Sequence, residues 1–461
     1  MPRAWGQEPP TPSDEPPAVA PQPAPPPAVE RTDLPAFAAP VTPGRPVVDG
    51  PLSLEDAARL AIQHSPRTGS LRAGVAQAEA KTRGARAMGG PQLSVSGLGA
   101  VNTSAMATLL NSAPGVMPSA ILSAPEKSSA GETLMFMLPL STGGRVASTV
   151  RSARALEQAA GQQLQGQEQE VALQARLAYR RALLARDLLA IVEDQARAAD
   201  ERVRVSRERY AIGKVTLTDV LRNQSQHAAV LRQLAMAQRD AESALVELKA
   251  TLGVSLSSKP RLTGDLSYSA PAATAEEAQK AALAQRAQIR EADLRLQAAE
   301  QDVKAAGSSY RPQVYLTAMQ SALAARVGGM NGAGVQVMAS LPLVDSGQRR
   351  AQVGEAKAML EAARQEREAR VLDVAQEVAK AYLALQAAEV GVRTSQAAVS
   401  QAQEDYRLAQ LRYEAGKALN LEVLDAQAAQ TEALTNRAQA LFDAASAADQ
   451  LRRAMGVDLS R

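Results

Sequence analysis

The sequence of 461 residues contains no cysteine, which excludes disulfide bonds, thiolate metal sites and an N-terminal lipid-modified cysteine. Aromatic residues are scarce, with 3 Phe, 1 Trp and 8 Tyr. Because large compact cores depend on aromatic side chains, we expect narrow stripes of small residues between helices instead. The two histidines, His64 and His227, lie in helical stretches without an acidic or nucleophilic cluster nearby. This pattern predicts no catalytic triad and no zinc site, and therefore no enzyme activity, no cofactor and no metal.

Long apolar runs are also missing. No stretch approaches the roughly 18–20 apolar residues that a transmembrane helix requires. The N-terminus has no charged segment followed by an apolar one, so no signal peptide is visible. The formal net charge is only +3, and basic residues alternate with acidic ones, which argues against binding to nucleic acid.

The most informative feature present is a long internal repeat. The stretch Arg209-Tyr-Ala-Ile-Gly-Lys214 returns as Arg412-Tyr-Glu-Ala-Gly-Lys417, 203 residues later. The same offset relates Pro139 to Pro342 and, further along, Gly253 to Gly456. A match of this length indicates a duplicated half-protein rather than a short solenoid repeat.

Apolar periodicity predicts the same elements in both halves. Residues 1–50 hold fifteen of the 26 prolines and predict a disordered leader, more readily a tether than a ligand for a partner domain. Residues 51–254 form the first repeat, residues 255–273 a connector, and residues 274–461 the second repeat. Within the first repeat we predict two short helices, strands at about 92–101 and 132–140 joined by a loop over 103–131, a long helix 144–210, a tip 210–216 and a helix 217–252. Within the second we predict two short helices, strands at about 313–322 and 334–342, a long helix 347–413, a tip 413–420 and a helix 421–455.

The long helices carry narrow seams at spacings of four and three residues, which is typical of coiled coils with closely packed helices. A helix from 144 to 210 would be roughly 100 Å long at 1.5 Å per residue. The first seam comprises Val171, Ala175, Ala178, Ala182, Ala185 and Leu189, and the second comprises Val374, Val378, Ala381, Leu385, Ala388 and Val392.

The four strands alternate apolar and polar residues, so each has one apolar face. Transmembrane strands have this length and alternation. Four strands cannot close a barrel, but the twelve strands of three chains can. A four-stranded sheet packed on helices is the alternative, and it would require helices with broad apolar faces. The predicted apolar faces carry Leu93, Val95 and Val101; Leu134, Phe136 and Leu138; Val314, Leu316 and Ala318; and Val335, Val337, Ala339 and Leu341.

The duplicated plan, the Pro-Leu-x-x-x-Gly sequence before each long helix and the Arg-Tyr-x-x-Gly-Lys tips resemble the TolC-like outer-membrane factor family over about residues 52–457. The resemblance implies a mainly α-helical homotrimer, with a periplasmic α-barrel of coiled helical hairpins and a twelve-stranded β-barrel in outer-membrane lipid. It implies a passive exit duct for drugs, metals or proteins that an inner-membrane transporter delivers through a periplasmic adaptor. It also implies a signal peptide, so we expect the printed start to lie inside a longer precursor. The aromatic girdles of such barrels are thin here, with Phe136, Tyr310 and Tyr315 as candidates.

The two tips are the candidate functional site. By position, the resemblance implies adaptor docking at Gly213, Lys214, Gly416 and Lys417. The glycines also suit a tight turn, and either lysine is equally a solvated charge at a helix C-terminus.

Acidic residues follow both tips. Three copies of Asp219, Glu422 and Asp425 would form acidic rings that attract cations; an ordinary solvated helix face is the alternative. The family's closed gate pairs an Asp like Asp219 with a Tyr like Tyr413 and with an Arg. Ala418 occupies that Arg position here, so the ionic part of the latch is absent or taken by Lys417.

Two other classes compete with the channel. A periplasmic adaptor also contains a coiled helical hairpin, but it carries one hairpin with flanking β-rich domains, which does not match two tandem halves. A soluble coiled-coil scaffold explains the seams but leaves the four half-apolar strands without a purpose.

Overall fold

The computed structural model describes residues 44–100, 129–325 and 330–459. Most of the predicted leader and of the predicted loop over 103–131 lies outside the described residues, as does Val101. The chain divides into two compact units, which cut across the repeats. The hairpin-end unit contains Ala185–Glu242 and Ser400–Thr435, and the larger unit contains Ala38–Leu184, Ser243–Val399 and Asn436–Arg461. Each of the four long helices contributes residues to both units.

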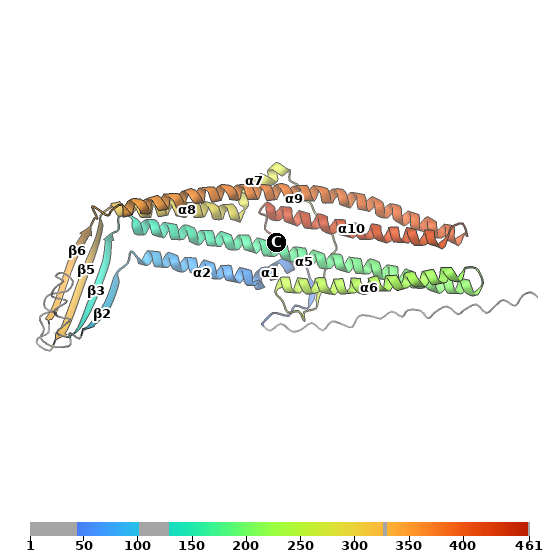
Figure 1. Cartoon of the computed structure of the whole chain (residues 1–461), viewed down its shortest axis with the longest axis horizontal. Helices are drawn as coiled ribbons and strands as arrows, with labels where there is room; N and C mark the ends of the chain where they lie inside the picture. Colours follow the sequence, from blue (N-terminus) through green and yellow to red (C-terminus); the bar gives the residue numbers. More distant parts are fainter. Residues whose placement is uncertain (1–43, 101–128, 326–329, 460–461) are drawn as a thin grey trace, which may run out of the picture. The chain divides into compact units, whose positions relative to one another are not determined.

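The larger unit contains one antiparallel sheet with the strand order β2-β3-β5-β6 (Figure 1). The strands are β2 (Gln92–Ala100), β3 (Ser129–Ser141), β5 (Gln313–Ala325) and β6 (Met330–Ser340). Their register places the predicted apolar residues on one face, because Leu93 pairs with Phe136, Leu316 with Leu138, and Ala318 with Val335. Toward the end of the sheet where β5 ends and β6 begins, the same face also carries Glu132, Gln320 and Asn331. Four strands that share a face with the predicted apolar residues are therefore confirmed.

The opposite face of the sheet carries no charged side chain in the described strands and mixes polar side chains with four methionines. Its described side chains are Gln92, Ser94, Ser96, Thr133, Met135, Met137, Pro139, Gln313, Tyr315, Thr317, Met319, Ser321, Gln336, Met338 and Ser340. Tyr315 lies on this face and donates from its hydroxyl to Gln313, so it does not fit the apolar-face girdle that was suggested for it. Tyr310 lies before β5 in a short 3-10 helix, where the guanidinium of Arg349 lies 4.9 Å from its ring centre. Of the three girdle candidates, Phe136 alone lies on the apolar face of a strand.

Each repeat contributes two shorter helices to the larger unit. They are α1 (Leu54–His64) and α2 (Pro66–Ala87), then α7 (Ala275–Gln285) and α8 (Ala287–Gly307). Ser53 caps α1 by accepting from the backbone N–H of Asp56. A small parallel pair, β1 (Gly50–Leu52) with β4 (Pro260–Leu262), joins the start of the first repeat to the connector. The apolar patterning did not predict this pair, because each strand has only three residues.

The long hairpins consist of α5 (Arg145–Ala211) with α6 (Leu217–Leu252), and α9 (Gln348–Glu414) with α10 (Asn420–Ala454). Both seams are partly buried at their centres. Ala175, Ala178 and Ala182 lie in one core cluster with Leu248 and Leu252. Val374, Val378, Ala381 and Leu385 of the second seam lie in another cluster with residues of α7 and α10. In the described ranges, no helix combines the length and the apolar character that crossing a membrane requires.

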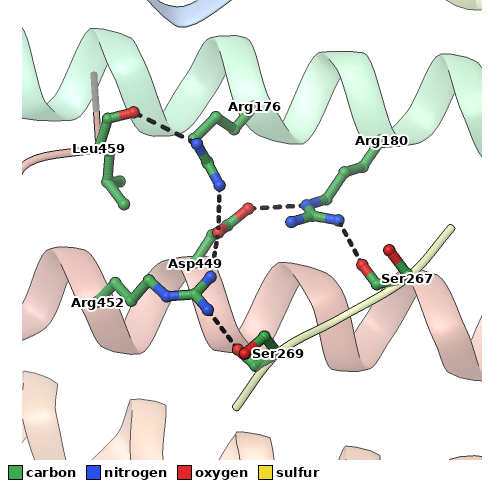
Figure 2. Close-up of polar contacts among 7 residues, drawn as sticks. All are labelled: Arg176, Arg180, Ser267, Ser269, Asp449, Arg452 and Leu459. Atoms are coloured by element: carbon green, nitrogen blue, oxygen red, sulfur yellow. Dashed lines mark hydrogen bonds and ion pairs between the residues drawn. The ribbon is translucent and has the colours of Figure 1, made fainter. Parts of the chain in front are cut away.

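A buried ionic cluster holds α5 and α10 together in the larger unit (Figure 2). Asp449 is fully buried and accepts from Arg176 at 3.1 Å, Arg180 at 2.7 Å and Arg452 at 3.1 Å. The same arginines donate to backbone carbonyls: Arg180 to Ser267 and Arg452 to Ser269, both in the connector, and Arg176 to Leu459 near the C-terminus. One carboxylate thus organises segments from both repeats and the connector between them.

Candidate functional site at the hairpin ends

The first tip closes with a glycine in the left-handed region. Gly213 has a φ of +70°, and its N–H donates to Tyr210 O at 2.9 Å. The next N–H, that of Lys214, donates to Arg209 O at 2.9 Å. These two bonds form a Schellman motif, which satisfies carbonyls at the end of α5 and requires a residue that adopts positive φ without strain.

The second tip repeats the same geometry at the end of α9. Gly416 has a φ of +69° and donates to Tyr413 O at 3.0 Å, while Lys417 N donates to Arg412 O at 2.8 Å. Both lysine side chains are exposed. The Gly-Lys pairs are therefore fully accounted for as helix ends, and they also present two exposed cations.

The acidic residues after the tips cap the returning helices. Asp219 accepts from the backbone N–H of Thr216 at 3.3 Å and from its hydroxyl at 2.7 Å, and Asp219 N donates to that hydroxyl. This is the reciprocal arrangement of a capping box at the start of α6. Glu422 occupies the equivalent position in the second repeat and accepts from Leu419 N at 3.3 Å. Asp425 lies three residues further along α10 and is exposed.

Tyr413 joins the two hairpins by a contact that the sequence did not predict. The guanidinium carbon of Arg209 lies 5.5 Å from the centre of the Tyr413 ring, a cation–π geometry. The structure thus gives Tyr413 a cationic partner on α5 and gives Asp219 a partner within its own turn. Ala418 is partly buried beside the second tip, and Arg412 lies 3.5 Å from Glu422.

Two further polar contacts within the hairpin-end unit were missed. Asn420 donates to Asn223 at 3.0 Å, and both side chains are buried. Arg202 hydrogen-bonds Tyr406; burial lowers the pKa of the guanidinium, and Tyr406 opposes that shift. A signal for the first contact existed in the repeat, because Asn420 corresponds to Leu217 and Asn223 corresponds to Ala426. At both positions one repeat has a polar residue where the other has an apolar residue, which indicates a polar contact that only one repeat makes.

The histidines do not form a metal centre in the described part of the chain. His227 is buried, and its Nε2 lies 4.0 Å from a carboxylate oxygen of the exposed Asp200. His64 ends α1, where its carbonyl accepts from Arg45. No group of three or more His, Cys, Asp or Glu residues that could hold a metal ion occurs in the described ranges.

Comparison with known proteins agrees with this architecture. The family model for outer membrane efflux proteins matches residues 57–254 and 279–457, one segment in each repeat. The chain is 27% identical over 268 residues to the outer membrane efflux protein BepC of Brucella suis, an alignment that spans 57% of this chain and 58% of BepC. The outer membrane protein VceC of Vibrio cholerae has a similar structure, with a TM-score of 0.72, 21% identity and coverage of 88% and 96% of the two chains. The open state of the Neisseria gonorrhoeae channel MtrE also has a TM-score of 0.72, with 19% identity and 88% and 89% coverage.

These matches favour the channel over the adaptor and the scaffold, since both repeats fall within the family model and the solved structures share the whole plan. TolC-like channels are trimeric. The chain belongs to the outer membrane efflux protein family, and its fold is that of a TolC-like outer-membrane channel.

Proposed function

We propose that three copies of this chain form an exit duct across the outer membrane, through which substrates pass passively from the periplasm to the exterior. The observation that carries the proposal is the two-faced sheet. On its apolar face, Leu93, Val95, Val335 and Val337 are 67%, 71%, 74% and 64% exposed in the single chain. Aliphatic side chains with this exposure require an apolar environment, and the opposite face carries no charge in the described strands.

The edges of the sheet support closure by further copies. β2 and β6 are the edge strands, with 9 and 11 residues, and long uncovered edges expose unpaired backbone groups. Because all neighbours in the order β2-β3-β5-β6 are antiparallel, β6 of one copy and β2 of the next also run antiparallel. Three sheets can therefore close into twelve strands with one uniform pattern, as outer-membrane barrels require.

The duct is proposed to work with two partners, a periplasmic adaptor and, through it, an inner-membrane transporter. The adaptor is assigned to the hairpin ends, where Lys214 and Lys417 present exposed cations beside the hydrogen-bonded turns at Gly213 and Gly416. Exposed charges at a defined turn suit docking against the helical hairpins of another protein.

An acidic gate is proposed next to this surface. Glu422 and Asp425 are exposed on one face of α10, and Asp219 follows the first tip. Because Asp219 and Glu422 also cap their helices, hydrogen bonds hold their carboxylates in place. Threefold repetition would place these fixed charges in rings, with Tyr413 held beside them by Arg209.

Fractionation and single-channel recording test the duct. We expect the mature protein in the outer-membrane fraction as a heat-resistant trimer that conducts ions in planar bilayers. A matched variant, Val335→Asp with Val337→Asp, should lose membrane insertion, whereas Gln336→Asp on the polar face should insert and change conductance. A monomer in the soluble fraction, or equal tolerance of charge on both faces, would contradict the proposal.

A further inference from the structure

The Arg209–Tyr413 contact is made between two copies of the same tip motif. Arg209 comes from the first tip and Tyr413 from the second, and each tip contains both an arginine and a tyrosine, at the offset of 203 residues. The contact therefore uses one of the two tip arginines and one of the two tip tyrosines. Arg412 and Tyr210 are the equivalent pair, located on the second and the first tip respectively.

The two tips are geometrically equivalent, which makes the correspondence more than a sequence match. Both end in a Schellman motif with nearly the same φ at the glycine, +70° and +69°, and with the same pair of backbone hydrogen bonds. Arg209 and Arg412 both occupy the position whose carbonyl accepts the second bond. Each arginine thus leaves its helix in a similar direction relative to its own tip.

We infer that Arg412 stacks on the Tyr210 ring of the next copy, so that the mouth of the trimer is a ring of six arginine–tyrosine contacts. The inference rests on the proposed trimer. In a closed ring the tips alternate first, second, first, second, and the rotation that carries the first tip onto the second carries the second onto the first tip of the neighbouring copy. The same rotation carries Arg209 over Tyr413 onto Arg412 over the partner subunit's Tyr210.

The surroundings of Arg412 fit this assignment. Its side chain is 60% exposed in the single chain, and its Nη1 lies 3.5 Å from a carboxylate oxygen of Glu422. A planar guanidinium can accept a carboxylate at its edge and an aromatic ring on its face at the same time. Glu422, which caps α10 through Leu419 N, then orients Arg412 for the neighbouring ring.

In the proposed ring, the junctions within a chain and the junctions between copies are predicted to differ in their other polar contacts. The Asn223–Asn420 bond belongs to the same hairpin-end unit, and the repeat equivalents of these residues are Ala426 and Leu217. Arg202 and Tyr406 correspond to Asp405 and Val203. The junction between two copies therefore has the same arginine–tyrosine contact as the junction within a chain. At the positions of the other two polar contacts it has different residues. Arg412 and Tyr210 thus hold together the junction between copies, which has fewer polar side-chain contacts than the junction within a chain.

Thiol cross-linking tests the inference cleanly, because the natural chain has no cysteine. The full-length trimer with Arg412→Cys and Tyr210→Cys is treated with a short bismaleimide and run on a denaturing gel. We expect covalent dimers and trimers. The reference pair, Arg209→Cys with Tyr413→Cys, should link within one chain and run as a monomer. As a matched control, Arg412→Cys with Glu208→Cys moves the second thiol about 200° around α5 and should give little product.

The native mass of the same samples distinguishes failure of the arginine–tyrosine ring from failure of the proposed trimeric duct. A native trimer without Arg412–Tyr210 cross-links would overturn the ring and leave the proposed duct intact. A native monomer would overturn both. In addition, Tyr210→Leu should weaken each junction about 2- to 5-fold in trimer dissociation, and Tyr210→Phe, which keeps the ring face, should restore it. Equal effects of Leu and Phe would contradict a stacking role.

Discussion

Replacing Asp449 by asparagine tests whether the buried ionic cluster holds the larger unit together. The substitution keeps the size of the side chain but removes the negative charge that Arg176, Arg180 and Arg452 share. Arg176 and Arg180 are 8% and 6% exposed at the side chain, so they would remain as buried cations without a counter-charge. Arg452 is 24% exposed and regains water more easily.

The expected loss follows from the burial of the cluster. Removing one partner of a buried ion pair typically destabilises a protein by about 3–5 kcal/mol, because the remaining charge is desolvated and uncompensated. We expect Asp449→Asn to lower the free energy of unfolding by about that amount at pH 7. Urea unfolding followed by the helical circular-dichroism signal measures this loss. The control is Asp443→Asn on the same helix, whose exposed carboxylate accepts from Gln439 at 2.9 Å and whose loss should cost less than about 0.5 kcal/mol.

The pH dependence provides a second measurement. Burial raises the pKa of Asp449, but the charges and hydrogen bonds of Arg180 and Arg176 lower it by more than burial raises it. The pKa therefore lies below its ordinary value of 3.8. A carboxyl group whose pKa is lower in the folded state contributes its full stability above the unfolded pKa and loses it as the pH falls toward the folded value. The difference between the natural protein and Asp449→Asn should therefore be constant above about pH 5 and shrink below pH 4. A loss below about 1 kcal/mol at pH 7, or a difference that does not shrink in acid, would refute this account.

Three further predictions concern the hairpins and the start of a long helix. Glu422→Ala with Asp425→Ala should reduce cation selectivity in planar bilayers, and unchanged reversal potentials would remove the acidic rings. Lys214→Glu with Lys417→Glu should weaken cross-linking to the adaptor and raise drug or metal sensitivity; normal sensitivity at normal trimer levels would count against docking there. Ser346 has a φ of +51°, so Ser346→Gly should stabilise the chain by about 0.5–1 kcal/mol in urea unfolding. Ser346→Ala, which retains the strain, should not stabilise it.

The regular parts of the fold were predictable because their physical causes are periodic. The seam of α5 repeats every three or four residues, and the strands alternate every second residue, so their type and faces follow from one sequence. The predicted bounds of the long helices, 144–210 and 347–413, differ from Arg145–Ala211 and Gln348–Glu414 by one residue at each end. The resemblance of the tips to a known family supplied the position of the site.

The contacts between distant segments were not predictable in the same way. Asp449 lies 269 residues from Arg180, and Asn420 lies 197 residues from Asn223. A single sequence contains no periodic signal for such pairs, which depend on how helices are placed beside each other. The resemblance suggested a bond between Asp219 and Tyr413 but gave no hint that the Tyr413 ring contacts Arg209. The local cap of Asp219, whose carboxylate lies 2.7 Å from the Thr216 hydroxyl within the same turn, was not predicted either.

Differences between the two repeats carry the information that periodicity lacks. The glycines, the tip arginines and the tip tyrosines recur at 203 residues. Each hairpin must close its own turn, and in the proposed ring each tip also presents the same stacking pair. Asp449 and Arg180, in contrast, correspond to Val246 and Leu383 in the other repeat. Each hairpin meets a hairpin of its own chain on one side and, in a trimer, a hairpin of another copy on the other. Polar residues that act within one chain can therefore lose their repeat symmetry: Asp449, Arg180, Asn223 and Asn420 have apolar repeat equivalents, whereas Arg202 corresponds to Asp405. In the proposed ring, the arginine–tyrosine pair that both tips repeat is the contact that all six junctions share.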